Sequence, residues 1–199
     1  MIKNITFLRH YKLEYPYDDK ANMNLEEYKS LTEGTIDPNI NSDIFEFLIK
    51  NFNKDSFNKY EIIFTSDYLR TKETAESINN YFSLGLKIEP NRILNEIPSR
   101  FIRDFKEKDY LQIQQGNRIE KYKERVLNKK QKIKRLKEID KFLQERKEKS
   151  ILIISHSYLI GQLNYFYNII NRNTDKYSEI DSEQYEIGGY LQGFSGKWY

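Results

Sequence analysis

The sequence contains no cysteine and only two histidines. Without cysteine the chain forms no disulfide and no thiolate metal site, which is typical of proteins from a reducing compartment. Two histidines and no clustered aspartate and glutamate motif leave few ligands from which to build a metal centre. We therefore expect a protein that needs neither a metal ion nor another cofactor.

Long apolar runs are missing as well. No run approaches the roughly 18 apolar residues that a membrane-spanning helix needs. The N-terminal apolar run is short and meets a charge at Arg9, so it does not resemble the core of a secretory signal. These absences predict a soluble, cytoplasmic protein that does not act at a membrane.

Neither sign of charge predominates. Lysine and arginine number 33 and aspartate and glutamate 30, which gives a net charge of +3. Such a balance gives no general attraction to nucleic acid or to an anionic membrane. Hydrophobic residues make up only 38% of the chain, but its 16 tyrosines and 12 phenylalanines each bury a large area. At 199 residues we expect a single domain that spans residues 1–199.

Three short apolar runs each end at a polar group that is capable of chemistry. The runs at residues 5–8 and 151–155 lead to His10 and His156, and a run at 62–66 leads to a helical-looking segment. Open α/β sheets bind their ligands at the carboxyl ends of the strands. The pattern predicts a site in which the three strand ends meet.

Two arginines belong to this pattern. Arg9 directly precedes His10, and Arg70 lies near the start of segment 67–80, where the free N–H groups of a helix favour an anion. Guanidinium groups bind phosphate oxygens in a planar fork, while imidazole titrates near neutrality. The combination predicts an anion site that contains a nucleophile or an acid–base group.

Four segments of the sequence together carry a family resemblance. They are FLRH at residues 7–10, TSDYLRTKETA at 65–75, LNEI at 94–97 and ISHS at 154–157. In this order they resemble the histidine phosphatase superfamily, which is also called phosphoglycerate mutase-like. The resemblance implies an α/β fold, a three-layer α/β/α sandwich with a mainly parallel central sheet. The branch with the phytase motif Arg-His-Gly-x-Arg-x-Pro is disfavoured, because residues 13–16 do not reproduce it.

The resemblance also implies a role for each matched residue. His10 would attack phosphorus in line and form a phosphohistidine, and the two arginines are expected to lower its pKa and keep it unprotonated. The oxygens of the transferred group would be held by Arg9, Arg70 and His156. Glu96 would protonate the departing oxygen and then act as a base on water. Other carboxylates stay open for this role, namely Asp104, Glu14 and Asp18.

Two segments depart from the family pattern. Tyr11 and Lys12 follow the first histidine, where the family commonly has glycine and glutamate. We include Lys12 as a candidate substrate contact, because its ammonium can add a donor to an anionic substrate, although a solvated surface lysine is the ordinary alternative. The segment at 98–101 also differs and leaves Arg100 and Arg103 as candidates for contact with a second anionic group.

Residues 117–149 are dense in lysine, glutamate and arginine, with apolar residues at mainly helical intervals. This spacing predicts one long charged helix, or two helices with a bend near residues 127–130. The interleaved acidic residues favour a solvated outer face with i,i+4 pairs over binding of RNA or of a membrane. A projecting arm that joins two copies in a homodimer is the alternative.

The function that these observations favour is hydrolysis of a phosphomonoester by a metal-independent phosphatase, through a phosphohistidine on His10. The substrate would be a small molecule or a phosphoprotein, with no nucleic-acid or membrane partner. Two alternatives stay open: phosphoryl transfer of the phosphoglycerate mutase type, and a non-catalytic protein that binds a phosphorylated ligand in regulation. Retention of both histidines and both arginines favours an enzyme.

Overall fold

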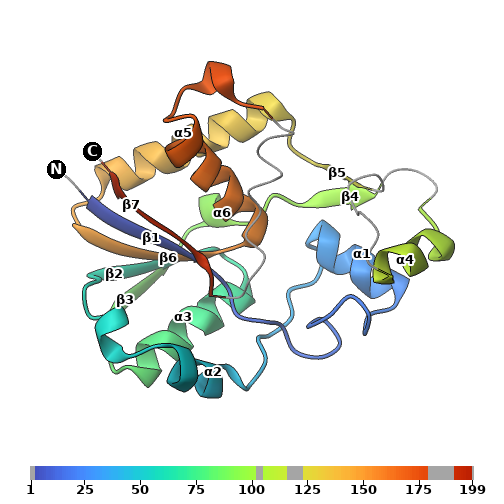
Figure 1. Cartoon of the computed structure of the whole chain (residues 1–199), viewed down its shortest axis with the longest axis horizontal. Helices are drawn as coiled ribbons and strands as arrows, with labels where there is room; N and C mark the ends of the chain where they lie inside the picture. Colours follow the sequence, from blue (N-terminus) through green and yellow to red (C-terminus); the bar gives the residue numbers. More distant parts are fainter. Residues whose placement is uncertain (1–2, 102–104, 116–122, 179–190, 199) are drawn as a thin grey trace.

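The computed structural model describes residues 3–101, 105–115, 123–178 and 191–198, and a five-stranded sheet lies at its centre (Figure 1). The strand order is β3-β2-β6-β1-β7. Pairing is parallel between β3, β2, β6 and β1, and β7 is antiparallel to β1. The expected mainly parallel sheet is therefore confirmed. Its strands are β1 (Lys3–Arg9), β2 (Ile62–Thr65), β3 (Lys87–Pro90), β6 (Ser150–Ser155) and β7 (Gly193–Trp198).

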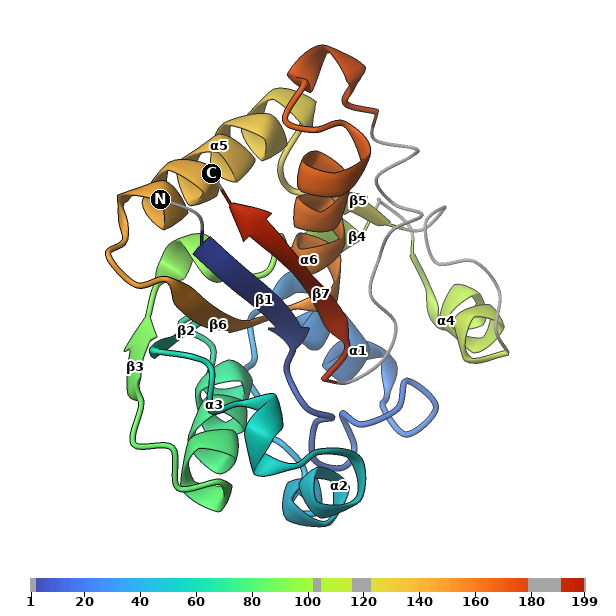
Figure 2. The same cartoon turned by 60° about the vertical axis from the view of Figure 1, so that its left-hand side comes forward.

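Helices cover both faces of the sheet (Figure 2). Strand β6 shows the alternation that this requires, since Ile151 and Ile153 belong to one buried cluster and Leu152 and Ile154 to the other. The first cluster includes side chains of α5 and α6, and the second includes side chains of α2 and α3. The expected three-layer α/β/α sandwich is confirmed. The helices are α2 (Ile44–Asn51), α3 (Leu69–Tyr81), α5 (Lys129–Glu145) and α6 (Ser157–Asn164).

A smaller unit lies to one side of the sheet, on the right in Figure 1. It contains α1 (Leu25–Glu33), α4 (Glu107–Gln114) and the antiparallel pair of β4 (Ser99–Phe101) and β5 (Lys123–Arg125). Tyr28 of α1 and Tyr110 of α4 stack with their ring centroids 4.9 Å apart. The apolar cluster around these rings is separate from the two that cover the sheet, so this unit has a small core of its own.

Short helical segments connect the longer elements. Helix α6 continues directly into a π-helical turn. Helical hydrogen bonding therefore extends past the end of α6 with a wider winding. In the part of the chain that the structure describes, these segments include the 3₁₀ turns at Lys54–Ser56, Arg92–Leu94 and Thr174–Lys176, and the π-helical turn at Tyr165–Ile169.

The charged segment at 117–149 is not one long helix. Within the described residues of this segment the helix is α5, and residues 123–125 form strand β5, while residues 117–122 lie outside the described residues. The reason is a capping box, in which the Asn128 side chain accepts from the Gln131 N–H at 3.0 Å and Gln131 accepts from the Asn128 N–H at 2.9 Å. At the other end, the Lys3 ammonium of β1 donates to the Leu143 carbonyl oxygen at 2.6 Å.

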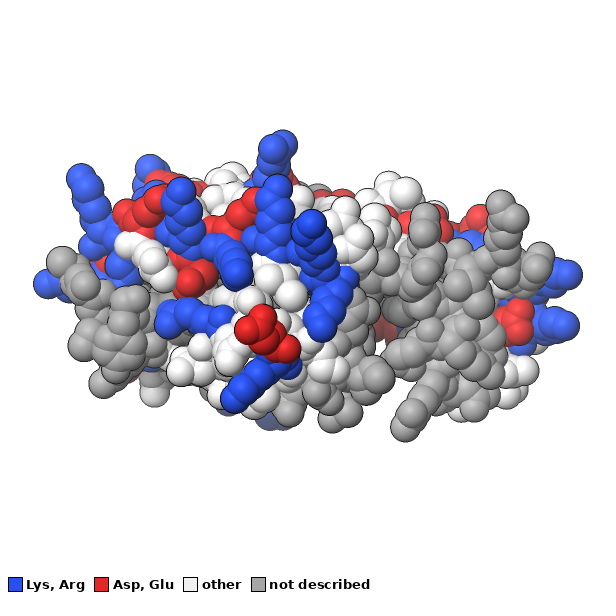
Figure 3. Space-filling model, turned by 90° about the horizontal axis from the view of Figure 1, so that it is seen from above, with Lys and Arg blue, Asp and Glu red and all other residues white. Residues whose placement is uncertain are grey.

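The two faces of α5 differ as the sequence predicted. Its outer face carries exposed i,i+4 pairs, Lys134–Glu138 at 3.8 Å and Lys141–Glu145 at 3.7 Å. Figure 3 shows acidic side chains interspersed among the lysines and arginines on the top of the molecule. The inner face is apolar and packs on the sheet, through Leu136, Ile139 and Leu143. Within the described ranges, no helix has the length and apolar character to cross a membrane.

Replacing Leu152 with alanine is expected to lower the free energy of unfolding by about 2–5 kcal/mol, because its fully buried side chain would leave a cavity beside the central strand. The matched control is Ile49→Ala, a residue 62% exposed on α2, which should change stability by less than about 0.5 kcal/mol. Urea denaturation followed by circular dichroism measures both. Small and equal changes in the free energy of unfolding of the two variants would contradict the central position of β6 in the apolar core.

Candidate active site

The carboxyl ends of β1, β2 and β6 meet at one edge of the sheet. The register sets Arg9 of β1 beside Ser155 of β6, and β2 ends close to the same level. The residues that follow these strands therefore emerge together, and two of them are His10 and His156. Their ring centroids are 5.3 Å apart, and only 6% and 1% of the two residues are exposed. The structure thus brings both predicted histidines into one buried site.

The backbone holds His10 in one tautomer. Its Nδ1 lies 2.6 Å from the carbonyl oxygen of Tyr11, which only accepts hydrogen bonds, so Nδ1 carries the proton and Nε2 the lone pair. Burial lowers the pKa of His10 well below its usual value of 6.5, and the positive charges of Arg70 and Arg9 lower this pKa further. At neutral pH the ring is therefore uncharged and its Nε2 is a potential nucleophile.

A serine hydroxyl positions His156. The Oγ atom of Ser66 lies 2.8 Å from His156 Nε2, and the same Oγ accepts a hydrogen bond from the Tyr68 N–H at 3.2 Å. Nδ1 is buried and has no hydrogen-bond partner among the described residues. His156 therefore presents a buried ring nitrogen whose hydrogen bonding the described parts of the chain leave incomplete.

The pKa of His156 is also well below its usual value. Burial is the largest cause, followed by the charges of Arg70, His10, Arg9 and Arg135. The site therefore combines fixed positive charge on arginine with imidazole rings that stay neutral.

Arg70 sits in the first turn of α3 and is 5% exposed. Its Nη1 forms an ion pair with Asp37 Oδ1 at 3.0 Å, and its guanidinium carbon lies 4.3 Å from the centroid of the Tyr68 ring. Asp37 also accepts a hydrogen bond from the N–H of Leu69 at 2.5 Å, at the N-terminus of α3. Arg70 Nε is buried and has no hydrogen-bond partner within the described parts of the chain. Because a guanidinium nitrogen only donates, this N–H lacks an acceptor there.

Glu96 lies beside the second histidine, at the N-terminus of α6. Its Oε1 accepts from the backbone N–H groups of Leu159 at 3.1 Å and Ile97 at 2.9 Å, and its Oε2 accepts from that of Tyr158 at 3.2 Å. These bonds orient the carboxyl group and place it one helical turn from His156. Glu96 is thus held near the site by backbone donors.

The rival carboxylates have other partners. Glu14 accepts hydrogen bonds from the backbone and side chain of Asn39, both at 3.3 Å. Asp18 accepts from the side chain of Asn22 at 3.0 Å. Glu96 is the candidate that contacts the helix following His156. Two further sequence candidates lie outside the described residues, Arg103 and Asp104.

The two residues after His10 turn toward α2. The Lys12 ammonium pairs with Asp43 Oδ2 at 2.6 Å, so the proposed contact of Lys12 with substrate finds no support in this geometry and stays a prediction. Tyr11 is 3% exposed and its ring packs against Phe47 with centroids 5.1 Å apart. Its backbone lies outside the left-handed region, so this position does not require the glycine that the family commonly has.

Sequence reasoning missed three residues around the site. Ser66 had a signal, because it follows a strand and lies within a family-like segment. Asp37 and Arg135 had none, since each reaches the site from a distant part of the chain. Among the described residues, no group of three or more His, Asp or Glu side chains is arranged to hold a metal ion.

The two neutral histidines predict a pH dependence of stability. Their pKa values lie below 6.5 in the folded chain because of burial and nearby arginines, so the unfolded chain binds more protons as the pH falls below 6.5. The free energy of unfolding should therefore decrease below pH 6.5, by up to about 1.4 kcal/mol per pH unit for each histidine. NMR titration of the two ring Hε1 signals checks the premise. Native signals that titrate at or above pH 6.5 would refute it.

Comparison with known proteins places this geometry within a known fold. No protein-family model matches the sequence, and no curated protein matches it. A solved phosphoglycerate mutase from Bacillus anthracis str. Sterne is 15% identical over 98% of this chain and 87% of its own, with a TM-score of 0.54.

Two mycobacterial structures are also similar. A glucosyl-3-phosphoglycerate phosphatase, solved in complex with VO3, is 14% identical over 98% of this chain and 90% of its own, with a TM-score of 0.57. Mycobacterial hydrolase 1 is 15% identical over 88% and 85%, with a TM-score of 0.51. The chain therefore has the phosphoglycerate mutase-like fold, as its four sequence segments predicted.

Proposed function

We propose that the protein is a phosphatase that transfers the phosphoryl group of a phosphomonoester first to His10 and then to water. The observation that supports this most directly is a buried donor, Arg70 Nε, that has no acceptor among the described residues, together with the unpartnered ring nitrogen Nδ1 of His156. A buried polar atom without a partner is costly unless a ligand completes its hydrogen bonding. The oxygens of a phosphoryl group are strong acceptors that suit the Arg70 Nε–H.

The charge of the site suits the first step. A phosphomonoester dianion repels an anionic nucleophile, whereas the neutral Nε2 of His10 approaches it without repulsion. Nε2 attacks phosphorus, a P–N bond forms, and the bond from phosphorus to the ester oxygen breaks. Arg9, Arg70 and His156 stabilise the charge on the equatorial oxygens, which removes the need for a metal ion in this role.

Glu96 supplies and recovers the proton in this proposal. Its Oε2 receives one backbone N–H and its Oε1 two, so Oε2 has room for the proton that passes to the departing oxygen. In the second step the Glu96 carboxylate takes a proton from water, whose oxygen attacks phosphorus and breaks the P–N bond. Phosphate, neutral His10 and protonated Glu96 result, so the cycle closes.

Similarity of fold supports phosphoryl transfer without choosing its acceptor. The similar structures include a mutase and a phosphatase, and the structure of the phosphatase contains VO3. A mutase would return the phosphoryl group to its substrate, and a binding protein would keep its phosphorylated ligand intact. Release of inorganic phosphate in proportion to alcohol product distinguishes the phosphatase from both.

Replacing His10 with alanine should reduce hydrolysis of p-nitrophenyl phosphate by a factor of roughly a thousand or more, because the nucleophile is lost. The assay measures nitrophenol and phosphate release in the presence of EDTA, at pH 5 to 8. Full activity of the His10→Ala variant would refute the phosphohistidine step.

The chain offers a matched pair of arginines for a second test. Arg172 pairs with Asp140 at 3.3 Å and lies 5.0 Å from the Tyr167 ring, much as Arg70 pairs with an aspartate beside a tyrosine. Arg70→Met should lower kcat/KM by roughly a hundredfold, because one donor to the transferred group is lost. Arg172→Met should leave kcat/KM nearly unchanged. Similar losses of kcat/KM in both variants would show that removal of an arginine paired with an aspartate acts through the fold, and would contradict the proposed contact of Arg70 with the phosphoryl group.

The lowered pKa of His10 predicts the pH profile of catalysis. Burial and the charges of Arg70 and Arg9 keep the ring neutral, so the acid limb of kcat/KM should fall below pH 6.5. Arg70→Met removes one positive charge, which should raise the pKa of His10 and shift the acid limb to higher pH. Initial rates between pH 4.5 and 8 measure the acid limb of the wild-type protein and that of the variant. An unshifted limb would contradict the proximity of the two groups.

A further inference from the structure

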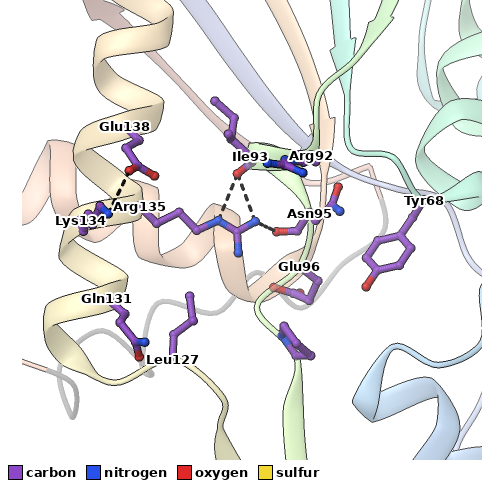
Figure 4. A pocket seen from close by; sticks show the side chains of 11 residues that line it. Tyr68, Arg92, Ile93, Asn95, Glu96, Leu127, Gln131, Lys134, Arg135 and Glu138 are labelled. Atoms are coloured by element: carbon purple, nitrogen blue, oxygen red, sulfur yellow. Dashed lines mark hydrogen bonds and ion pairs between the residues drawn. The ribbon is translucent and has the colours of Figure 1, made fainter.

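A cavity of about 560 Å³ opens beside Glu96, between α5 and the segment that leads from β3 to β4 (Figure 4). It shares Tyr68 and Glu96 with the candidate active site, and the Tyr68 ring lies 5.0 Å from the His156 ring. A cavity of this volume is large enough for a small-molecule substituent. The cavity and the candidate active site therefore adjoin at Tyr68 and Glu96.

The cavity lies on the side of Glu96 where the leaving group of the substrate is expected. In the proposed mechanism Glu96 gives its proton to the ester oxygen, so this oxygen must lie within hydrogen-bond reach of Glu96. The atoms attached to that oxygen then lie on the Glu96 side of the transferred phosphoryl group. The cavity beside Glu96 is the space that can receive them.

Positive charge lines the cavity. Arg135 of α5 donates from Nε and Nη2 to the carbonyl oxygen of Ile93, at 3.2 and 3.1 Å, and from Nη2 to that of Asn95. Neutral carbonyl groups accept these bonds, and among the described residues no carboxylate forms an ion pair with Arg135. Figure 4 shows its guanidinium reaching from α5 toward the loop that carries Glu96.

A second arginine lies at the same cavity. Arg92 is exposed, and within the described ranges its side chain forms neither a hydrogen bond nor an ion pair. Lys134 also lines the cavity, but Glu138 neutralises it at 3.8 Å. The remaining carboxylate, Glu96, is protonated before transfer in the proposed mechanism. With Glu96 protonated, the described lining of the cavity carries three cationic side chains, Arg92, Lys134 and Arg135, against the one carboxylate of Glu138.

We propose that this cavity, the anion pocket, binds a second anionic group of the substrate, a carboxylate or a phosphate on the leaving side, through Arg92 and Arg135. This inference rests on the proposed phosphatase function and narrows its substrates to acidic phosphomonoesters. A planar guanidinium with unused N–H groups matches an oxyanion in both geometry and charge.

Two esters of the same shape test the inference. 4-Carboxyphenyl phosphate carries the second negative charge, and 4-carbamoylphenyl phosphate is its neutral counterpart of similar size and shape. The wild-type protein should hydrolyse the carboxylated ester with roughly tenfold higher kcat/KM, the scale of one charge-assisted hydrogen bond. A ratio of one or less, with measurable hydrolysis of both esters, would overturn the inference.

Substitutions test whether Arg92 and Arg135 cause the preference for the carboxylated ester. Arg135→Gln and Arg92→Gln should each reduce the ratio toward one, whereas Lys137→Gln should keep it. Lys137 is the matched control, because it is exposed on α5 and does not line the cavity. Arg135 also holds the loop at Ile93, so Arg92→Gln keeps the test decisive if the Arg135 variant does not fold. A ratio that both arginine variants retain would reject the assignment.

Failure of the proposed function gives a different result. If the wild-type protein hydrolyses neither ester, the phosphatase proposal fails, and calorimetric binding of the same two esters then tests the anion pocket alone. Tighter binding of the carboxylated ester, lost in Arg92→Gln, would support the pocket in a non-catalytic binding protein. Equal affinities would reject it.

Discussion

Parallel pairing of β6 with both β1 and β2 is the constraint on which the site depends. This register ends the three strands at one edge, where His10, Ser66 and His156 follow them. A slip of one residue would turn every side chain of a strand to the opposite face. Packing on both faces of the sheet disfavours such a slip, because alternate residues of β6 belong to two separate apolar clusters. Packing far from the chemistry therefore fixes where the histidines emerge.

Bringing two arginines and two imidazoles into a buried site creates an electrostatic cost, and the local structure reduces it. Asp37 pairs with Arg70 and also accepts from the N–H of Leu69 at the N-terminus of α3, while the Tyr68 ring stacks on the same guanidinium. The histidines respond by staying neutral, since burial and the arginines lower their pKa values. The same charges that favour an anion thus keep the potential nucleophile unprotonated.

Helix α5 connects the outer surface with the inner site. Its exposed lysines pair with glutamates one turn later, and its apolar residues pack on the sheet. Arg135 lies between these faces and binds the carbonyl groups of the loop before Glu96. Backbone N–H groups of α6 hold Glu96 from the other side. The carboxyl group is therefore placed by two helices that are far apart in sequence from its own loop.

The sequence by itself determined the three strands that lead to the site, with the Arg9-His10 pair and His156 at the ends of two of them, because apolar runs and the residues that end them are local patterns. The Asn128 and Gln131 capping box was also local, although the charged segment was predicted as one long helix or as two helices with a bend near residues 127–130. Only the tertiary structure decided three contacts: Ser66 with His156 across 90 residues, Arg70 with Asp37 across 33, and Arg135 with Ile93 across 42. Such contacts leave no periodicity in the sequence, because chain packing and not local conformation sets the distance between their atoms.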